Sequence, residues 1–241
     1  MKQSYENIER VFAEEGAKLK EGSWLDKSIK IVKKMVDGHI AFDPNSLKAH
    51  RIMTVIAILG EDLAECKNRN IPLREKLENF YKVQNSDSRL HEISTLAGLL
   101  RNNFSAEFIP KEDRETPDIR LISREGAIEC KIARNFERTV ERIEKAHDQL
   151  KNYPGIKIAD VFLYFNITET EIPRFCEAVF ERVKRKMVRV DNISGLQAIN
   201  LRFLESKVLE NGKLSTAFKA FYKVDETFSN AKEVLLAFNE H

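Results

Sequence analysis

Two carboxylates and one amine occur close together in a part of the chain that is otherwise apolar. Asp118 follows a proline, and Glu129 and Lys131 are separated by one residue within the run Ala-Ile-Glu-Cys-Lys-Ile-Ala. Burying a charged side chain costs several kcal/mol unless a partner or a metal compensates it. These side chains are therefore expected either to reach water at the end of a strand or to hold a cation.

This set of side chains suits the hydrolysis of a phosphodiester. Mg²⁺ takes oxygen ligands and is usually bound through one or two carboxylates together with substrate phosphate, so Asp118 and Glu129 are candidate ligands. The metal would polarise the phosphate and acidify its water. Lys131 could orient or deprotonate the attacking water, or offset the charge that builds on a phosphoryl oxygen.

A β-hairpin is predicted to position these side chains. Residues 118–122 and 127–133 form two short segments rich in β-branched residues. The segment between them, 123–126, has turn chemistry and ends in Gly126, which can adopt a positive φ. The two segments are therefore expected to be antiparallel strands.

The alternation of side chains along a strand decides which groups can meet. Glu129 and Lys131 are expected on one face, and Cys130 on the other face, packed inward. The pairing register could bring Asp118 beside Glu129. The predicted arrangement is a carboxylate pair with an ammonium about 7 Å along the strand.

The order Pro117-Asp118 and then Glu129-Cys130-Lys131 resembles the signature of the PD-(D/E)XK nuclease superfamily, which has the restriction-endonuclease-like fold. The motif alone is common, because its residues are common and its spacing is loose. Its order relative to the flanking elements makes the resemblance more specific. The resemblance covers about residues 88–166.

The flanking elements agree with this resemblance. Members of the superfamily place a helix with a glutamate before the first strand, and residues 90–100 have helical spacing with Glu92 in that position. A long helix follows the Glu-x-Lys strand, and RecB-like members carry Gln-x-x-x-Tyr on it, which Gln149 and Tyr153 match. A further apolar strand is expected at residues 159–165.

The resemblance implies an α/β protein with a restriction-endonuclease-like αβββαβ core and a mixed sheet, preceded by a helical N-terminal region. It implies a metal-dependent nuclease that uses Mg²⁺ or Mn²⁺, with DNA as the expected partner and a homodimer as one arrangement. The catalytic residues that it implies are Asp118, Glu129, Lys131 and Glu92. The implied metal ligands are Asp118, Glu129, Glu92 and the Cys130 backbone carbonyl. The implied substrate-binding residues are Gln149, Tyr153 and Arg134.

The same residues also have ordinary interpretations. Asp118 suits a turn after Pro117, and Glu129 and Lys131 could pair with each other on a solvated strand face. Glu92 could be an exposed helical charge. In function, the alternatives are an inactive nuclease fold that binds nucleic acid or serves as a scaffold, and a protein-interaction role of the N-terminal helices. The motif does not distinguish DNA from RNA.

Cationic side chains recur at helical spacing after the Glu-x-Lys strand. They are Arg134, Arg138, Arg142 and Lys145, and Gln149 continues the stripe. One interpretation is an exposed helix with i,i+4 ion pairs such as that of Glu141 with Lys145. The other is a cationic edge that leads from Lys131 toward the substrate. Residues 182–189 form a second basic segment that could bind phosphate nonspecifically.

The composition favours a helical protein with a substantial core. The chain has 241 residues, of which 32% are charged and nine are glycine, and its net charge is +2. Nucleic-acid binding therefore requires a local basic patch rather than a global charge.

The odd number of cysteines, three, indicates reduced thiols and a cytoplasmic location. The start of the chain does not resemble a signal peptide, and no apolar run is long enough for a membrane span.

The expected organisation is a helical N-terminal region, residues 1–87, and a nuclease-like domain, residues 88–241, with its core at 88–166. Helices are predicted at 5–20, 24–36, 47–68, 73–83, 171–188 and 230–238, a polar linker at 84–88, strands at 197–204 and 215–224, and a turn at Asn211-Gly212.

Overall fold

The computed structural model describes residues 1–43, 46–78, 80, 83–110, 116–164, 170–186, 195–208, 214–224 and 229–239. The chain forms two compact units. The first is Met1–Ala97 with Glu205–Ala217, and the second is Gly98–Leu204 with Phe218–His241. The boundary expected between residues 87 and 88 falls inside a helix, α5 (Val83–Arg101), which runs from the first unit into the second.

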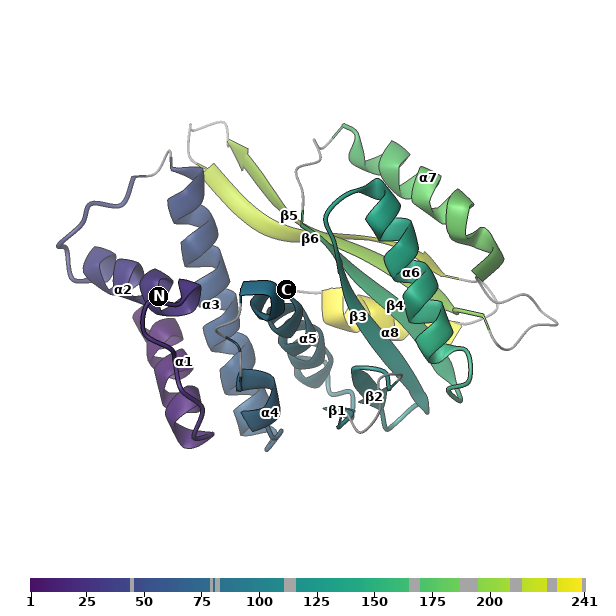
Figure 1. Cartoon of the computed structure of the whole chain (residues 1–241), viewed down its shortest axis with the longest axis horizontal. Helices are drawn as coiled ribbons and strands as arrows, with labels where there is room; N and C mark the ends of the chain where they lie inside the picture. Colours follow the sequence, from purple (N-terminus) through teal and green to yellow (C-terminus); the bar gives the residue numbers. More distant parts are fainter. Residues whose placement is uncertain are drawn as a thin grey trace. The chain divides into compact units, whose positions relative to one another are not determined.

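The first unit contains the N-terminal helices (Figure 1). They are α1 (Lys2–Glu14), α2 (Trp24–Val36), α3 (Leu47–Asn68), α4 (Arg74–Leu77) and the greater part of α5. The bounds of α2 and α3 confirm the predicted helices. The helix predicted at 73–83 is wrong in length, because the backbone of Glu78 leaves the helical region at ψ 128°. The polar run 84–88 is helical rather than a linker, since polar residues cost a helix little and tertiary context overrides propensity.

Close packing of α1 on α3 organises this unit. The apolar stripe of α1, which includes Ile8 and Val11, is fully buried, as are Ile56 and Leu59 of α3. Gly60 lies where the helices touch, because a Cβ atom there would be 2.2 Å from the Ser4 carbonyl oxygen. The absence of a side chain thus allows the two backbones to approach.

The second unit is built on an open mixed sheet with the strand order β1-β2-β3-β4-β5-β6. The strands are β1 (Ala106–Phe108), β2 (Ile119–Leu121), β3 (Gly126–Ala133), β4 (Ile156–Leu163), β5 (Ala198–Val208) and β6 (Leu214–Val224), the last two of which continue into the first unit. Pairing is antiparallel from β1 to β3 and parallel from β3 to β5. The structure confirms the α/β class and the predicted hairpin. It also confirms the strands expected near 197–204 and 215–224. The expected turn at Asn211-Gly212 and the end of segment 182–189 lie outside the described residues.

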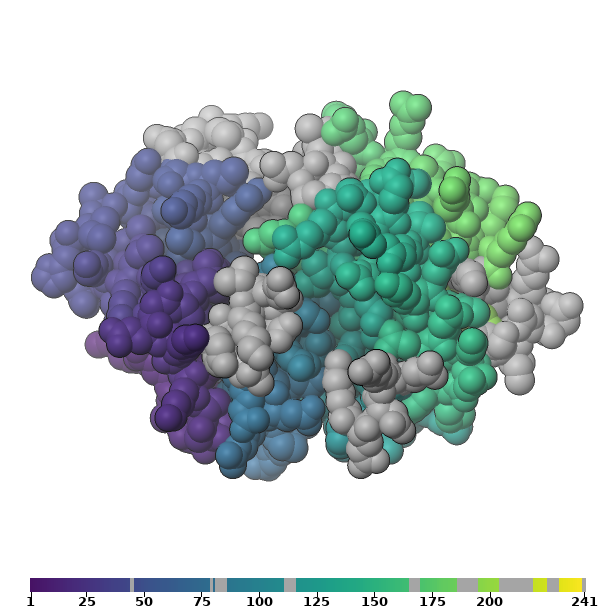
Figure 2. Space-filling model, viewed as in Figure 1, coloured from purple at the N-terminus to yellow at the C-terminus, as the bar shows by residue number. Residues whose placement is uncertain are grey.

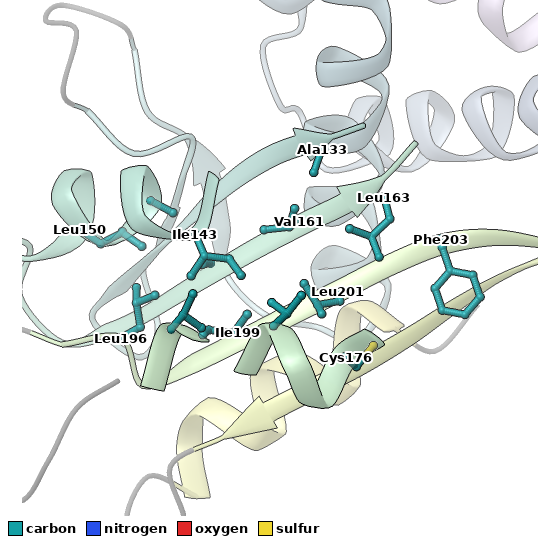
Figure 3. Packing of buried hydrophobic residues seen from close by; sticks show 14 of the residues in the cluster. Ala133, Ile143, Leu150, Val161, Leu163, Cys176, Leu196, Ile199, Leu201 and Phe203 are labelled. Atoms are coloured by element: carbon teal, nitrogen blue, oxygen red, sulfur yellow. The ribbon is translucent and has the colours of Figure 1, made fainter. Parts of the chain in front are cut away.

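Helices cover both faces of this sheet (Figure 1). One face carries α6 (Phe136–Leu150) and α7 (Ile172–Val183), and the other carries α8 (Ser229–Asn239). Figure 3 shows the apolar cluster under α6 and α7, in which Ile143, Val161 and Leu201 are fully buried. Parallel strands are commonly covered on both faces because crossover helices pack on them. The expected inward packing of Cys130 is confirmed, and Ala127 and Ala133 on the opposite face of β3 are also buried.

Candidate active site

The β2–β3 hairpin brings Asp118 and Glu129 together as the sequence predicted. Ile119 pairs with Ile128 in antiparallel register, so Asp118, one residue earlier, lies opposite Glu129. The backbone N–H of Cys130 donates a hydrogen bond of 2.9 Å to Oδ2 of Asp118. Each of the two acidic residues is only 2% exposed. The hairpin thus holds two carboxylates next to each other in a largely water-free position.

Lys131 lies on the same strand face as Glu129 and forms an ion pair with it. The side chain of Lys131 is 18% exposed, whereas that of Glu129 is 2% exposed. The ammonium therefore extends from the buried carboxylate toward solvent, as a long side chain can. The solvated strand face considered above is wrong, because both carboxylates are buried, although the pairing of Glu129 with Lys131 is present.

The donor chemistry of this cluster fits a hard divalent cation. Asp118 and Glu129 contribute carboxylate oxygens, which are the ligands that Mg²⁺ and Mn²⁺ prefer. Two carboxylates side by side in a low-dielectric environment repel each other. A bound cation would offset this repulsion. The N–H group of Cys130 contacts Asp118, while the proposed ligand role of its carbonyl stays a prediction.

Helix α6 connects β3 to β4 and packs on the face of β3 that carries Glu129. Its first turn is capped by Asn135, whose side chain accepts a hydrogen bond of 2.8 Å from the Arg138 N–H. Thr139, Ile143, Ala146 and Leu150 form its buried stripe. These residues fix the rotation of the helix, and that rotation decides which side chains lie on its two flanks.

The two flanks of α6 have different neighbours. On one flank Phe136 makes an edge contact with Phe175 of α7, with ring centroids 5.5 Å apart. Gln149, which is half-buried, lies on the other flank, and Tyr153 follows one turn later. The pKa of Arg120 on β2 is raised, mainly by its hydrogen bond and attraction to Glu107, and to a smaller degree by Tyr153. Gln149 therefore lies on the flank of α6 away from α7, and Tyr153 follows the end of the helix at Leu150.

Arg134, the third expected substrate-binding residue, follows β3 directly. Its guanidinium lies 5.4 Å from the ring centroid of Tyr164, which follows β4 and is 53% exposed. Ala133 pairs with Leu163 in the parallel register, so the two residues meet at the carboxyl ends of neighbouring strands. The sequence did not indicate Tyr164, because an isolated tyrosine after an apolar strand carries no distinctive spacing.

Glu92 belongs to the first unit and is buried there at 2% exposure. It accepts hydrogen bonds from Lys76 at 2.7 Å, from Arg89 at 2.8 Å and from the Ser88 hydroxyl at 3.1 Å. The interpretation of Glu92 as an exposed helical charge is therefore wrong. Its role as a catalytic residue and metal ligand stays a prediction.

A buried polar network on the α8 face of the sheet was not expected from the sequence. Asn200 donates to Asp160 at 2.9 Å, and the Arg202 guanidinium lies 3.4 Å from the same carboxylate. Asn200 and Asn239 of α8 exchange two amide hydrogen bonds of 3.1 Å. The network attaches the end of α8 to the sheet. Its only sequence signal is an acidic residue inside an apolar strand, as at Glu129.

Comparison of the chain with models of protein families, with curated proteins and with solved structures gives no match. None of the described helices has the length and apolarity needed to cross a bilayer. Inference about function therefore depends on the geometry of the site and on the sequence motif.

Proposed function

We propose that the protein is a metal-dependent nuclease that hydrolyses phosphodiester bonds, with DNA as the expected substrate and Mg²⁺ or Mn²⁺ as the cofactor. The observation that carries this proposal is the pair of buried carboxylates, Asp118 and Glu129, placed opposite each other with Lys131 beside them. Few structural roles require two acidic side chains at one buried position. A site for a hard cation next to an amine explains all three residues.

The chain's own groups have separable tasks in this proposal. Asp118 and Glu129 would hold the cation, and the Cys130 N–H fixes the orientation of the Asp118 carboxylate. When bound, the cation would polarise the phosphate and acidify a water molecule. Lys131, partly exposed beside Glu129, would position that water or stabilise negative charge on a phosphoryl oxygen. Its contact with Glu129 would hold the amine near the scissile group.

The order of elements around the site supports a restriction-endonuclease-like core. The succession α5-β1-β2-β3-α6-β4 is the αβββαβ order that the sequence resemblance implies. Gln149 lies on the flank of α6 away from α7, and Tyr153 follows the helix, which is consistent with a role of Gln149 and Tyr153 at the same site. Fold-level similarity alone does not define function, so the site residues carry the argument.

The proposal is tested by incubating the purified full-length chain with single- and double-stranded DNA and RNA, in Mg²⁺, Mn²⁺ or a chelator. We expect cleavage that needs the metal. Asp118→Asn and Lys131→Met should each reduce the cleavage rate by about 10²-fold or more, because one removes a ligand charge and the other the amine. Asp148→Asn serves as the matched control, since Asp148 is an exposed carboxylate on α6.

Folding of each variant is checked by circular dichroism and thermal unfolding. Loss of cleavage in both site variants, with the control unchanged, supports the proposal. Wild-type cleavage rates in folded Asp118→Asn and Lys131→Met would contradict it. Binding of nucleic acid without cleavage in any metal would instead favour the inactive nuclease fold considered as the alternative.

A further inference from the structure

Most charged side chains on the outer side of α6 are paired with one another. Glu141 binds Arg138 and also Lys145, whose Nζ lies 2.7 Å from Oε1 of Glu141. The hydrogen bonds from Lys145 and Arg138 lower the pKa of Glu141 to about 2. The ion-pair interpretation of the cationic stripe is therefore correct for Arg138 and Lys145.

Arg142 differs from these neighbours. Its side chain is half-buried, and its Nε atom is fully buried without a hydrogen-bond partner. Within the part of the chain that the structure describes, its guanidinium has neither a hydrogen bond nor an ion pair. A guanidinium stays charged under all ordinary conditions and presents five donors, so partial burial without an acceptor is unfavourable. The arrangement becomes favourable when an anion binds there.

The position of Arg142 on α6 places it on the flank that faces away from α7. Gln149 follows seven residues later, which is close to two whole helical turns. Arg142 therefore shares the flank of Gln149, opposite to the flank on which Phe136 contacts α7. Figure 2 shows residues of α6 at the molecular surface in this view.

The height of Arg142 along the sheet also matches the candidate site. α6 runs opposite to β3, because it returns the chain to the start of the parallel strand β4. Arg142 is six residues, or about 9 Å, from the start of α6. Lys131 and Glu129 are two and four residues, or about 7 and 13 Å, from the end of β3. By this count the backbone of Arg142 lies at about the level of these two site residues along the sheet.

We propose that Arg142 is a substrate-binding residue whose guanidinium holds a backbone phosphate of the nucleic acid next to the scissile bond. The planar fork of a guanidinium matches two phosphate oxygens, and its charge suits a phosphodiester. This inference rests on the proposed nuclease function. It adds a phosphate contact that comes from α6, beside the carboxylates and amine of the β2–β3 hairpin.

The test measures nucleic-acid binding by the intact chain without cleavage. Fluorescently labelled single- and double-stranded DNA, with labelled RNA as a separate arm, are titrated with protein in chelator at several salt concentrations. Arg142→Met keeps the apolar stem and removes the charge. We expect it to weaken binding about 10-fold and to lower the slope of log affinity against log salt by about 1. Arg138→Met is the matched control, because Arg138 already pairs with Glu141, and it should change affinity less than about twofold.

A second variant and a second measurement separate phosphate binding from a structural role. Arg142→Lys keeps the charge but not the fork, so its affinity should lie between those of wild type and Arg142→Met. The thermal unfolding midpoint of Arg142→Met should not fall, because no protein partner is lost. A large fall in that midpoint with unchanged DNA affinity in Arg142→Lys would overturn the inference.

The result also separates this inference from the nuclease proposal. Cleavage by wild type with equal DNA affinity in wild type and Arg142→Met would overturn the phosphate contact and leave the nuclease function standing. Weaker binding by Arg142→Met in a protein that never cleaves would support the contact and contradict the nuclease function. If wild type binds none of the labelled nucleic acids, the inference is wrong.

Discussion

Buried acidic residues decide what can be inferred about this protein at the scale of single residues. Glu129 pairs with Lys131, two positions further along the chain, and the spacing of that pair is visible in the sequence. Glu92 pairs with Lys76 across sixteen positions, and Asp160 with Asn200 across forty. A sequence pattern reveals short-range partners, because they share a strand or a helical turn, but long-range partners depend on the tertiary fold.

The Lys76–Glu92 pair gives a prediction about stability. Each side chain is 2% exposed, so removing one partner takes an opposite charge away from a buried charged group of the first unit. We expect Glu92→Ala to lower the free energy of unfolding by about 3–5 kcal/mol, measured by denaturant titration. The double variant Lys76→Met with Glu92→Leu removes both charges and should recover most of that loss, since apolar side chains of similar size can replace a buried pair.

The same double variant also tests the catalytic role that the sequence resemblance implies for Glu92. If Glu92 assists the metal, cleavage should stay at least about 10-fold below wild type even though stability has recovered. Wild-type cleavage by a stable double variant would show that Glu92 has only a structural role. Arg89 is 20% exposed and can turn toward water in this variant, so it adds no buried charge.

At the scale of elements, the sequence predicted those segments whose own pattern defines them. The amphipathic helix α2 and the hairpin strands β2 and β3 were predicted, because their periodicity and turn residues are local. Strand β1 was missed, since its three residues are too few to show an alternation, and it becomes a strand only by pairing with β2. The sequence also could not predict which flank of α6 faces the site, because this depends on where α7 packs.

Gly155 gives a prediction about the register of the sheet. It precedes β4 with φ +72°, and a Cβ atom there would lie 1.8 Å from the carbonyl oxygen of Glu125. That oxygen accepts the Ile156 N–H at 2.9 Å where β3 and β4 begin to pair. We expect Gly155→Ala to lower the free energy of unfolding by about 2–4 kcal/mol, from the positive φ and the steric overlap together. Denaturant unfolding measures the loss.

Gly38→Ala is the matched control for this substitution. Gly38 has φ +74°, but nothing lies within 4 Å of the position of its Cβ. The control should therefore cost only about 1 kcal/mol, which is the conformational term alone. Equal losses in the two variants would mean that the contact with Glu125 does not restrict the start of β4. A larger loss in Gly155→Ala would support its role in the register that carries Glu129 and Lys131.

At the scale of the whole molecule, the chain passes between the two compact units inside regular elements. The boundaries at 97/98, 204/205 and 217/218 fall within α5, β5 and β6. Each of these elements is continuous in the structure. The sequence suggested a linker before residue 88, because polar residues there resemble one, and this explains why the expected domain boundary differs from the compact units. Unfolding one unit must break an element that also belongs to the other.

Two of the three cysteines test whether the two units unfold together. Cys66 lies in the first unit, Cys176 lies in the second, and both are buried. Burial also raises the pKa of the Cys176 thiol to about 11, so it reacts slowly while the unit is folded. We expect both thiols to become reactive at the same denaturant concentration, because three shared elements couple the units. Pulsed alkylation at increasing urea concentration, with mass spectrometry of the two peptides, measures the two midpoints. A midpoint for Cys66 well below that for Cys176 would show that the helical unit opens alone, and the shared elements would then not transmit unfolding between the units.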